Sequence, residues 1–396
     1  MTTEDSIVAL VQDAIRTREP LLVQGNGTKA GMLRPVQAAR TVSTSGLSGI
    51  NLYAPKELII SAASGTPLPV IENAMAEAGQ HLIAEPPDLS DLLGASGKPQ
   101  TLGGVTATNL SGPRRVAWGA MRDHVMGIRA VTGRAEVIRS GGRVLKNVTG
   151  LDLCKLFTGS HGTLGIITEI TLKVLPAPEA TGTLILPGLD AVVAVQALSA
   201  ALGSPFGVSG AAWLPPEAVA RVPGLAGING SATLIRIEEF APSVVYRIGR
   251  LKDQLAASNA ITLDTPASLA VWKDIRDARP LAAAPEDAVW RVSTRPSSGP
   301  GVLEAVRSAG VAGFLDWGGG LAWLAGPADT ATHAAVEAAA RAAGGVWMLV
   351  RAPDTLRATV RVVPDEAAPL ARITRGVKAA MDPAGILNPG RLYAGL

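Results

Sequence analysis

Apolar runs alternate with glycine turns over the first half of the chain. Residues 3–17 carry apolar side chains at helical spacing and are predicted to form an amphipathic helix. Residues 21–24 are predicted to form a strand that ends in a glycine turn, and residues 67–78 a second helix. Further strands are predicted at residues 58–61, 128–131, 135–139 and 166–174. This alternation predicts a mixed α+β fold with several glycine loops.

One segment shows neither the apolar spacing of a helix nor that of a strand. Residues 93–112 consist largely of Gly, Ser, Thr, Ala and Asn, so we expect neither a helix nor a regular strand there. Such small side chains let the main chain approach a ligand closely. The pair of prolines at Pro176 and Pro178 ends the preceding strand and is predicted to mark a domain boundary.

The pattern of apolar residues changes after the prolines. Strand and helix patterns alternate from residue 183 to residue 308, and residues 314–324 read as a hairpin. A helix at 330–343, a strand at 346–351 and a last helix at 370–381 complete the pattern. We therefore expect a second α+β lobe, followed by a turn-rich segment up to the end of the chain.

Composition narrows the class of protein. The chain has 396 residues, of which 47% are hydrophobic and 17% charged, so it can bury a large core and is not disordered. Its 36 basic and 33 acidic residues give a net charge of +3 without a basic run, and we expect no nucleic-acid partner. The 44 glycines are not periodic, which excludes collagen and favours functional glycine loops.

The N-terminal sequence and the single cysteine bear on location. Cys154 cannot form an internal disulfide and lies in an apolar run, so it is predicted to be a small buried residue. The first residues carry Glu4 and Asp5 rather than a basic and then apolar stretch, and no run of apolar residues is long enough to span a bilayer. We expect a cytoplasmic protein, with at most peripheral association with the inner face of the cell membrane.

The first glycine loop, residues 25–29, can present main-chain N–H groups to a phosphate. It does not match a Rossmann loop, because Gly31 is one place late and no acidic residue occurs between Glu19 and Glu57. Gly97-Lys98 likewise lacks the Walker spacing. Taken alone, residues 25–29 fit a tight turn as well as they fit a phosphate site.

Three further segments decide between these interpretations. Residues 101–112 and 159–167 are glycine-rich and carry hydroxyl groups, and residues 387–391 read Leu-Asn-Pro-Gly-Arg. Together with residues 25–29 they resemble the FAD-binding domain of the vanillyl-alcohol oxidase / p-cresol methylhydroxylase family, over residues 18–178 and 366–396. The resemblance implies a two-subdomain FAD-binding domain at 1–178, a smaller α+β cap lobe at 179–365 and a C-terminal segment, 366–396, that returns to complete the FAD site.

The resemblance also assigns cofactor residues. The pyrophosphate loop of the family matches Gly25, Asn26, Gly27, Thr28 and Lys29, and its second loop matches Thr101, Gly103, Gly104, Ala107, Asn109 and Gly112. The segment at the adenine half and the flavin edge matches Gly159, Gly162, Ile166 and Ile167, and the terminal motif matches Asn388. Some members attach FAD to a histidine of the first loop, where this chain has Thr28, so non-covalent FAD is implied.

Within that family, residues 109–115 and 121–127 and the C-terminal motif are most similar to FAD-binding subunits of bacterial glycolate oxidases. This implies a complex with a larger paralogous flavin subunit and an iron–sulfur subunit, which oxidises a 2-hydroxy acid to a 2-oxo acid. The chain itself would have an accessory or electron-relay role. The alternative is a self-sufficient FAD-dependent oxidase or dehydrogenase of a small hydroxy acid or alcohol.

Candidate catalytic groups are few. His124, beside Asp123, is the leading candidate for a base, and Arg114 or Arg115 could stabilise charge on a reduced flavin, although surface ion pairs explain the arginines equally well. His161 is expected to hydrogen-bond FAD and His333 to face solvent. Arg351, Arg357 and Arg361 are expected on solvated positions, with a carboxylate-binding site as the alternative. His81 is expected to have a structural role. None of the histidines has metal-ligand spacing, and no metal is expected.

Overall fold

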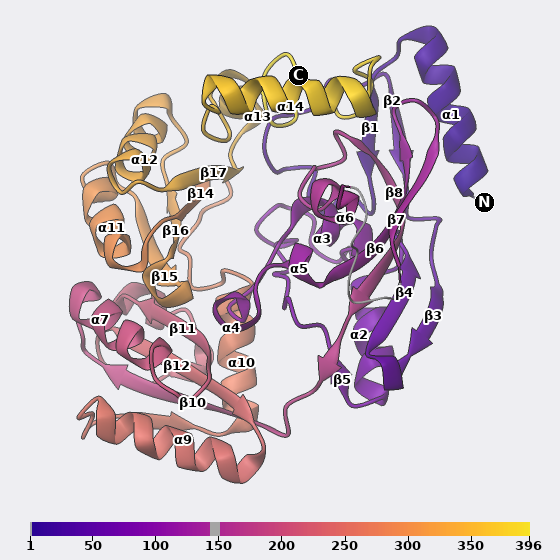
Figure 1. Cartoon of the computed structure of the whole chain (residues 1–396). Helices are drawn as coiled ribbons and strands as arrows, with labels where there is room; N and C mark the ends of the chain where they lie inside the picture. Colours follow the sequence, from indigo (N-terminus) through magenta and orange to yellow (C-terminus); the bar gives the residue numbers. More distant parts are fainter. Residues whose placement is uncertain (1, 143–150) are drawn as a thin grey trace. The chain divides into compact units, whose positions relative to one another are not determined.

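A computed structural model describes residues 2–142 and 151–396 and divides the chain into two compact units (Figure 1). The first unit contains Met1–Leu110, Ala120–Ala177 and Asp365–Leu396, and the second contains Ser111–Gly119 and Pro178–Pro364. Residues 111–119, which sequence analysis places in the FAD-binding domain, thus group with the second unit.

An antiparallel five-stranded sheet forms the centre of the first unit. Its strands are ordered β3-β4-β8-β6-β7. They span Ile50–Ala54 (β3), Ile59–Ala63 (β4), Val125–Thr132 (β6), Val137–Gly141 (β7) and Gly165–Lys173 (β8). Two smaller pairs accompany the sheet: β1 (Leu21–Gln24) runs parallel to β2 (Arg40–Ser43), and β5 (Gln80–His81) pairs with β9 (Leu175–Pro176).

Helices cover the sheet through two apolar clusters. The described helices of this unit are α1 (Glu4–Thr17), α2 (Leu68–Glu77), α3 (Leu102–Thr108), α5 (Met121–His124), α6 (Leu153–Phe157) and α14 (Ala368–Met381). Side chains of α2, α3 and α6 pack on one cluster with Ile128 and Ile170, whereas α1 packs with β1 and Ile166 in the other. Because neighbouring strand residues point to opposite faces, a single strand contributes to both clusters.

The helix α3 contradicts the expectation of an irregular segment at 93–112. Thr101 caps it, since the Thr101 hydroxyl accepts a hydrogen bond from the Gly104 N–H at 3.2 Å. A Cβ on Gly103 would lie 2.8 Å from the Cβ of Ser64, so only glycine allows this helix to lie so close to β4. Tertiary packing therefore overrides the low helix propensity of the small residues.

The second unit is built on one antiparallel sheet of eight strands, ordered β13-β10-β12-β11-β15-β16-β14-β17. The strands span Ala180–Pro187 (β10), Val208–Leu214 (β11), Ala232–Glu239 (β12), Ile261–Leu263 (β13), Ala288–Ser293 (β14), Ala312–Asp316 (β15), Leu321–Gly326 (β16) and Val346–Arg351 (β17). The predicted hairpin is present as β15 and β16, joined by a short turn at Trp317–Gly319.

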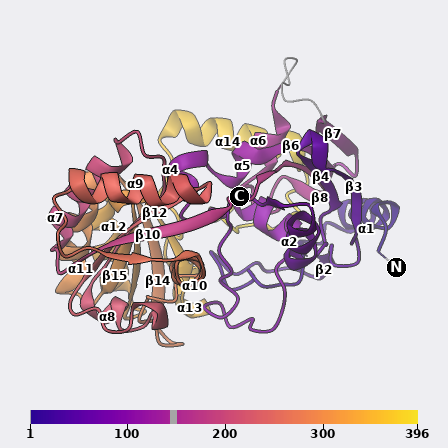
Figure 2. The ribbon, with the colours of Figure 1, turned by 90° about the horizontal axis from the view of Figure 1, so that it is seen from below.

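Helices pack on both faces of this sheet. They are α4 (Arg115–Trp118), α7 (Ala191–Leu202), α8 (Pro216–Val219), α9 (Ala241–Gln254), α10 (Thr265–Arg276), α11 (Gly299–Arg307), α12 (Thr330–Ala342) and α13 (Asp354–Thr359). On β10, a Cβ at Gly182 would meet Ile248 of α9, whereas Thr183 accepts a hydrogen bond from Trp272 of α10 at 2.9 Å. The helices α9 and α10 therefore lie on opposite sides of β10 (Figure 2).

Two expectations about single residues have opposite outcomes. Cys154 is buried as predicted, and burial raises the pKa of its thiol. The expectation that His333 faces solvent is wrong: its side chain is buried, its Nδ1 accepts a hydrogen bond from Trp290 at 3.1 Å, and its ring packs edge-on against Trp347. The helix α12 turns His333 toward the sheet, and burial lowers the pKa of the imidazole.

The arginines expected on solvated positions near the end of the second unit are held by protein groups. Arg357 is buried and pairs with Asp354, so a solvated position is wrong for it. Arg361 forms two hydrogen bonds with Glu337, and Arg351 donates to the carbonyls of Asp287 and Ala284. In the described part of the chain, no helix is long and apolar enough to cross a membrane.

Candidate functional site

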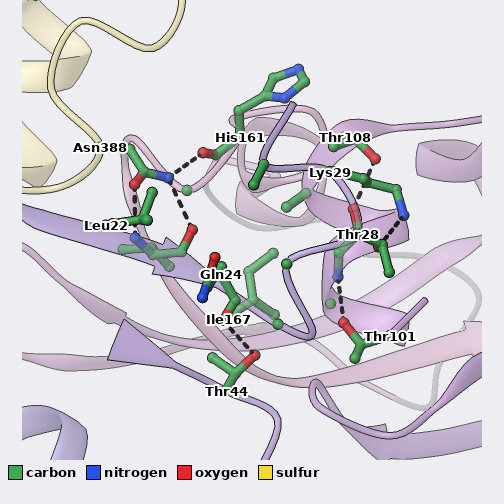
Figure 3. A pocket seen from close by; sticks show the side chains of 18 of the residues that line it. Leu22, Gln24, Thr28, Lys29, Thr44, Thr101, Thr108, His161, Ile167 and Asn388 are labelled. Carbon is green, nitrogen blue, oxygen red and sulfur yellow. Dashed lines mark hydrogen bonds between the residues drawn. The ribbon is translucent and has the colours of Figure 1, made fainter. Parts of the chain in front are cut away.

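Four separate segments of the first unit, together with Thr44 after β2, line one pocket (Figure 3). They are the end of β1 with the first glycine loop, the start of α3, the loop before β8 and the C-terminal segment. The lining residues are Leu22, Val23, Gln24, Gly25, Asn26, Gly27, Thr28, Lys29, Ala30, Thr44, Thr101, Gly103, Gly104, Ala107, Thr108, His161, Gly162, Gly165, Ile167, Asn388 and Arg391. The four motifs that sequence analysis grouped by resemblance thus meet in space.

Four of the assigned cofactor residues do not line this pocket: Asn109, Gly112, Gly159 and Ile166. Ile166 points into the apolar cluster under α1, because Ile167, the next residue on β8, faces the pocket. Asn109 ends α3, and its side-chain oxygen accepts a hydrogen bond from the Arg122 N–H at 3.0 Å. Gly159 faces Asn109, and Gly112 belongs to the second unit.

The first glycine loop presents unpaired main-chain donors to the pocket. Within the described residues, the amides of Asn26, Gly27, Thr28 and Lys29 have no hydrogen-bond acceptor. Consecutive N–H groups of this kind form a concave site for an anion. The loop therefore has the donor set that a phosphate group requires.

Lys29 adds a positive charge to this loop. Its ammonium donates to two neutral oxygens, Gln100 Oε1 at 2.9 Å and Thr28 Oγ1 at 3.5 Å. Desolvation by the surrounding protein lowers the pKa of Lys29 to about 8, against a smaller opposing effect of Asp88. A phosphate beside Lys29 would offset this desolvation, so the lysine and the amides favour the same kind of ligand.

The C-terminal segment fixes the loops of the pocket. Asn388 Oδ1 accepts a hydrogen bond from the Val23 N–H at 2.7 Å, and its Nδ2 donates to the His161 carbonyl at 2.8 Å (Figure 3). Leu387 bridges to Leu21 as a further parallel neighbour of β1. Asn388 therefore joins the strand before the first glycine loop to the loop before β8.

Arg391 is a site residue that sequence reasoning missed. Its guanidinium donates to the carbonyls of Lys29 at 2.7 Å, Arg34 at 3.1 Å and Ala30 at 3.3 Å. These bonds tie the end of the first glycine loop to the C-terminal segment. Its place at the end of the Asn-Pro-Gly-Arg motif is the signal that could have found it.

His161 is in the pocket, and its ionisation is suppressed. It has a left-handed backbone conformation with φ of 53°, which turns its carbonyl toward Asn388. Burial, with a smaller effect of Arg391, lowers the pKa of His161 to about 3. The imidazole is therefore neutral at physiological pH and can donate or accept a hydrogen bond.

The other catalytic candidates lie elsewhere. His124 is buried at the end of α5 and does not line the pocket. Arg114 belongs to the second unit, where it forms a bidentate ion pair with Glu238 at 2.6 and 3.0 Å, so a surface ion pair is the wrong description. Arg115 lies 4.6 Å over the ring of Trp317 in the same unit.

Comparisons with known proteins show the family of the chain. A family model described as a FAD binding domain matches residues 1–141. The chain is 34% identical to glycolate oxidase subunit GlcE of Escherichia coli over 99% of its own length and 97% of that protein. The chain belongs to the family of GlcE, within the FAD-binding oxidoreductases. It is thus a FAD-dependent oxidoreductase.

Partial relatives and solved structures extend this result. Glycolate oxidase subunit GlcD of Bacillus subtilis is 43% identical over 100 residues, which are 25% of this chain and 20% of that protein. The structure of p-cresol methylhydroxylase with bound substrate superposes with a TM-score of 0.73 at 14% identity, covering 99% of this chain and 87% of that one. The second comparison shows the fold alone and confirms the expected α+β FAD-binding architecture with a cap.

The pocket fits the cofactor of this family. Its unpaired amides and Lys29 match a pyrophosphate. Gly25 has no room for a side chain, because a Cβ there would lie 2.3 Å from Thr101 Oγ1. Among the described residues, no group of three or more His, Cys, Asp and Glu side chains could hold a metal ion.

The pKa of Lys29 predicts a pH dependence of FAD binding. Without ligand the lysine loses its proton near pH 8, whereas a bound pyrophosphate favours the charged form. FAD affinity should therefore be nearly constant below pH 8 and fall as the pH rises above it. Titration of the apoprotein with FAD at several pH values, followed by flavin fluorescence, measures this.

The variant Lys29→Gln removes the charge and should weaken FAD binding about 10- to 100-fold, with no fall above pH 8. Lys98→Gln is the matched control, since Lys98 is exposed on the segment that leads to Gln100. Equal pH profiles for Lys29→Gln and the wild type would contradict the assigned role of Lys29.

Proposed function

We propose that this chain is the FAD-binding subunit of a glycolate oxidase-like complex, which oxidises a 2-hydroxy acid to a 2-oxo acid. The observation that carries the proposal is the full-length relationship to GlcE together with a pocket assembled from the four FAD motifs. When bound, FAD would supply the acceptor for the hydride of the hydroxy acid, which carries both electrons, while the hydroxyl proton would go to a base.

The residues of this chain would hold the cofactor. Lys29 and the amides of residues 26–29 bind the pyrophosphate, and Arg391 holds the end of that loop through the Lys29 carbonyl. Asn388 orients the loop that carries His161, whose neutral imidazole offers a hydrogen bond to the cofactor. Thr28 occupies the place of the histidine that attaches FAD in some relatives, and we propose that FAD is held without a covalent bond.

We also propose an accessory or electron-relay role for the chain. A base that removes the hydroxyl proton should have a pKa not far from the working pH. The pKa of His161 is about 3, His124 does not line the pocket, and His333 is engaged with Trp290 in the core of the second unit. The placement of these histidines therefore favours a partner that supplies the base.

Anaerobic mixing of the isolated, FAD-loaded chain with glycolate or D-lactate tests this role. The accessory role predicts no rapid loss of flavin absorbance near ~450 nm, a band that belongs to the oxidised cofactor. Rapid bleaching by the isolated chain would contradict it and support a self-sufficient oxidase or dehydrogenase of a small hydroxy acid. Co-purification from the native host should also recover a larger paralogous flavin subunit and an iron–sulfur subunit.

A further inference from the structure

The Nε of one arginine in the second unit has no hydrogen-bond partner among the described residues. Arg291 lies on β14 directly opposite Trp323 on β16. Its Nε is enclosed and has no hydrogen-bond acceptor among the described residues. An enclosed donor without an acceptor costs free energy that folded proteins usually avoid. The unpaired Nε of Arg291 therefore suggests that a ligand supplies the missing acceptor.

Two indole rings hold the guanidinium in place. The central carbon of Arg291 lies 5.0 Å from the ring centre of Trp323 and 5.4 Å from that of Trp317. Arginine stacks on aromatic rings through its planar face, which leaves the N–H groups at its edge free to point at an acceptor. The stacking thus fixes the cation but provides no partner for its donors.

Around Arg291, positive side chains outnumber negative ones. Arg115 lies over the same Trp317 ring at 4.6 Å, and Asp316 is the neighbouring carboxylate. Burial and then the nearby Arg115 lower the pKa of Arg291 to about 10, while Asp316 opposes them. An added anion would lower the free energy of this arrangement.

We propose that Arg291, held by Trp317 and Trp323 beside Arg115, binds the carboxylate group of a small organic acid. A carboxylate is planar and matches the edge of a guanidinium with two parallel hydrogen bonds. The choice of a carboxylate among anions rests on the proposed function, whereas the anion site itself rests on the geometry of Arg291. The residues that form it all belong to the second unit.

Calorimetric titration of the FAD-loaded protein with oxalate at low ionic strength tests the site. Oxalate has no hydroxyl carbon to oxidise, so binding is measured apart from turnover. Arg291→Gln should bind oxalate at least about tenfold more weakly than the wild type, because a charge-assisted pair is lost. Arg291→Lys, which keeps the charge but not the fork, should fall between them. Arg307→Gln, with a side chain 80% exposed, should bind like the wild type.

Unchanged oxalate affinity in a folded Arg291→Gln protein would overturn the site. If the Gln variant does not fold, wild-type oxalate affinity in Arg291→Lys would overturn it. Inorganic phosphate binding as tightly as oxalate would overturn the choice of a carboxylate. Flavin absorbance is recorded on each sample, so loss of the anion site is distinguished from loss of FAD. Because the titration involves no turnover, its failure leaves the proposed subunit role standing.

Discussion

Replacing Gly25 by alanine is expected to weaken FAD binding about 10- to 100-fold, the effect of overpacking a close contact. A Cβ at residue 25 would lie 2.3 Å from the Oγ1 of Thr101. That hydroxyl caps α3 through the Gly104 N–H, so it cannot move away without freeing the cap. Either the first glycine loop shifts or α3 does, and both line the pocket. Equilibrium dialysis against FAD measures the loss.

A second substitution separates the contact from a general effect on folding. In Gly25→Ala with Thr101→Ala the nearest clashing atom is gone, so the double variant should bind FAD no more weakly than Thr101→Ala alone. Gly376→Ala, in α14 with open space around the added Cβ, is the matched control and should bind FAD normally while gaining stability. If Gly25→Ala retained wild-type affinity, the close contact would not matter for the cofactor.

The sequence was sufficient for the parts of the site that have a local signal. A strand followed by Gly25 and Gly27 predicts a glycine loop, and this loop is recognisable as part of a FAD site in combination with the other three segments, including the motif around Asn388. The amphipathic helix α1 and the hairpin of β15 and β16 also follow from spacing alone. Each of these features depends on residues close together in the chain.

Features that depend on distant residues were missed. Arg391 acts on the Lys29 carbonyl 362 positions earlier, and α3 forms because Gly103 packs on Ser64. His333 is buried against Trp290, which donates a hydrogen bond to it, and against Trp347. No local pattern reports these partners, since a lone histidine on a helix reads the same way exposed or buried.

The packing of residues 111–119 with the second unit also depends on distant residues, above all on Glu238. Arg114 joins this segment to β12 by two hydrogen bonds from its Nε and Nη2 to the Glu238 carboxylate, and Trp317 donates to the Gly112 carbonyl at 3.0 Å. Arg236 approaches the same carboxylate at 3.3 Å. One buried carboxylate thus pairs with two buried arginines, Arg114 and Arg236.

Glu238→Gln should lower the free energy of unfolding of the second unit by about 3–5 kcal/mol, because it removes the buried negative charge that pairs with Arg114 and Arg236. All seven tryptophans belong to this unit, so urea unfolding followed by tryptophan fluorescence reports on it directly. The control is Glu239→Gln on the next residue, whose half-exposed ion pair with Arg247 should contribute less than about 1 kcal/mol. Equal unfolding midpoints for the two variants would contradict the argument.

Acid should reproduce the effect of Glu238→Gln in the wild type. Burial raises the pKa of Glu238, but Arg236 and Arg114 outweigh it and lower the value to about 2, from an ordinary value of 4.5. The folded form therefore binds this proton less readily than the unfolded form, so the stabilisation is complete above pH 4.5 and is lost as the pH falls toward 2.

Glu238→Gln should lose less stability than the wild type over this range. Adding Arg114→Met to Glu238→Gln should recover part of the loss, because one of the two buried cations is then removed.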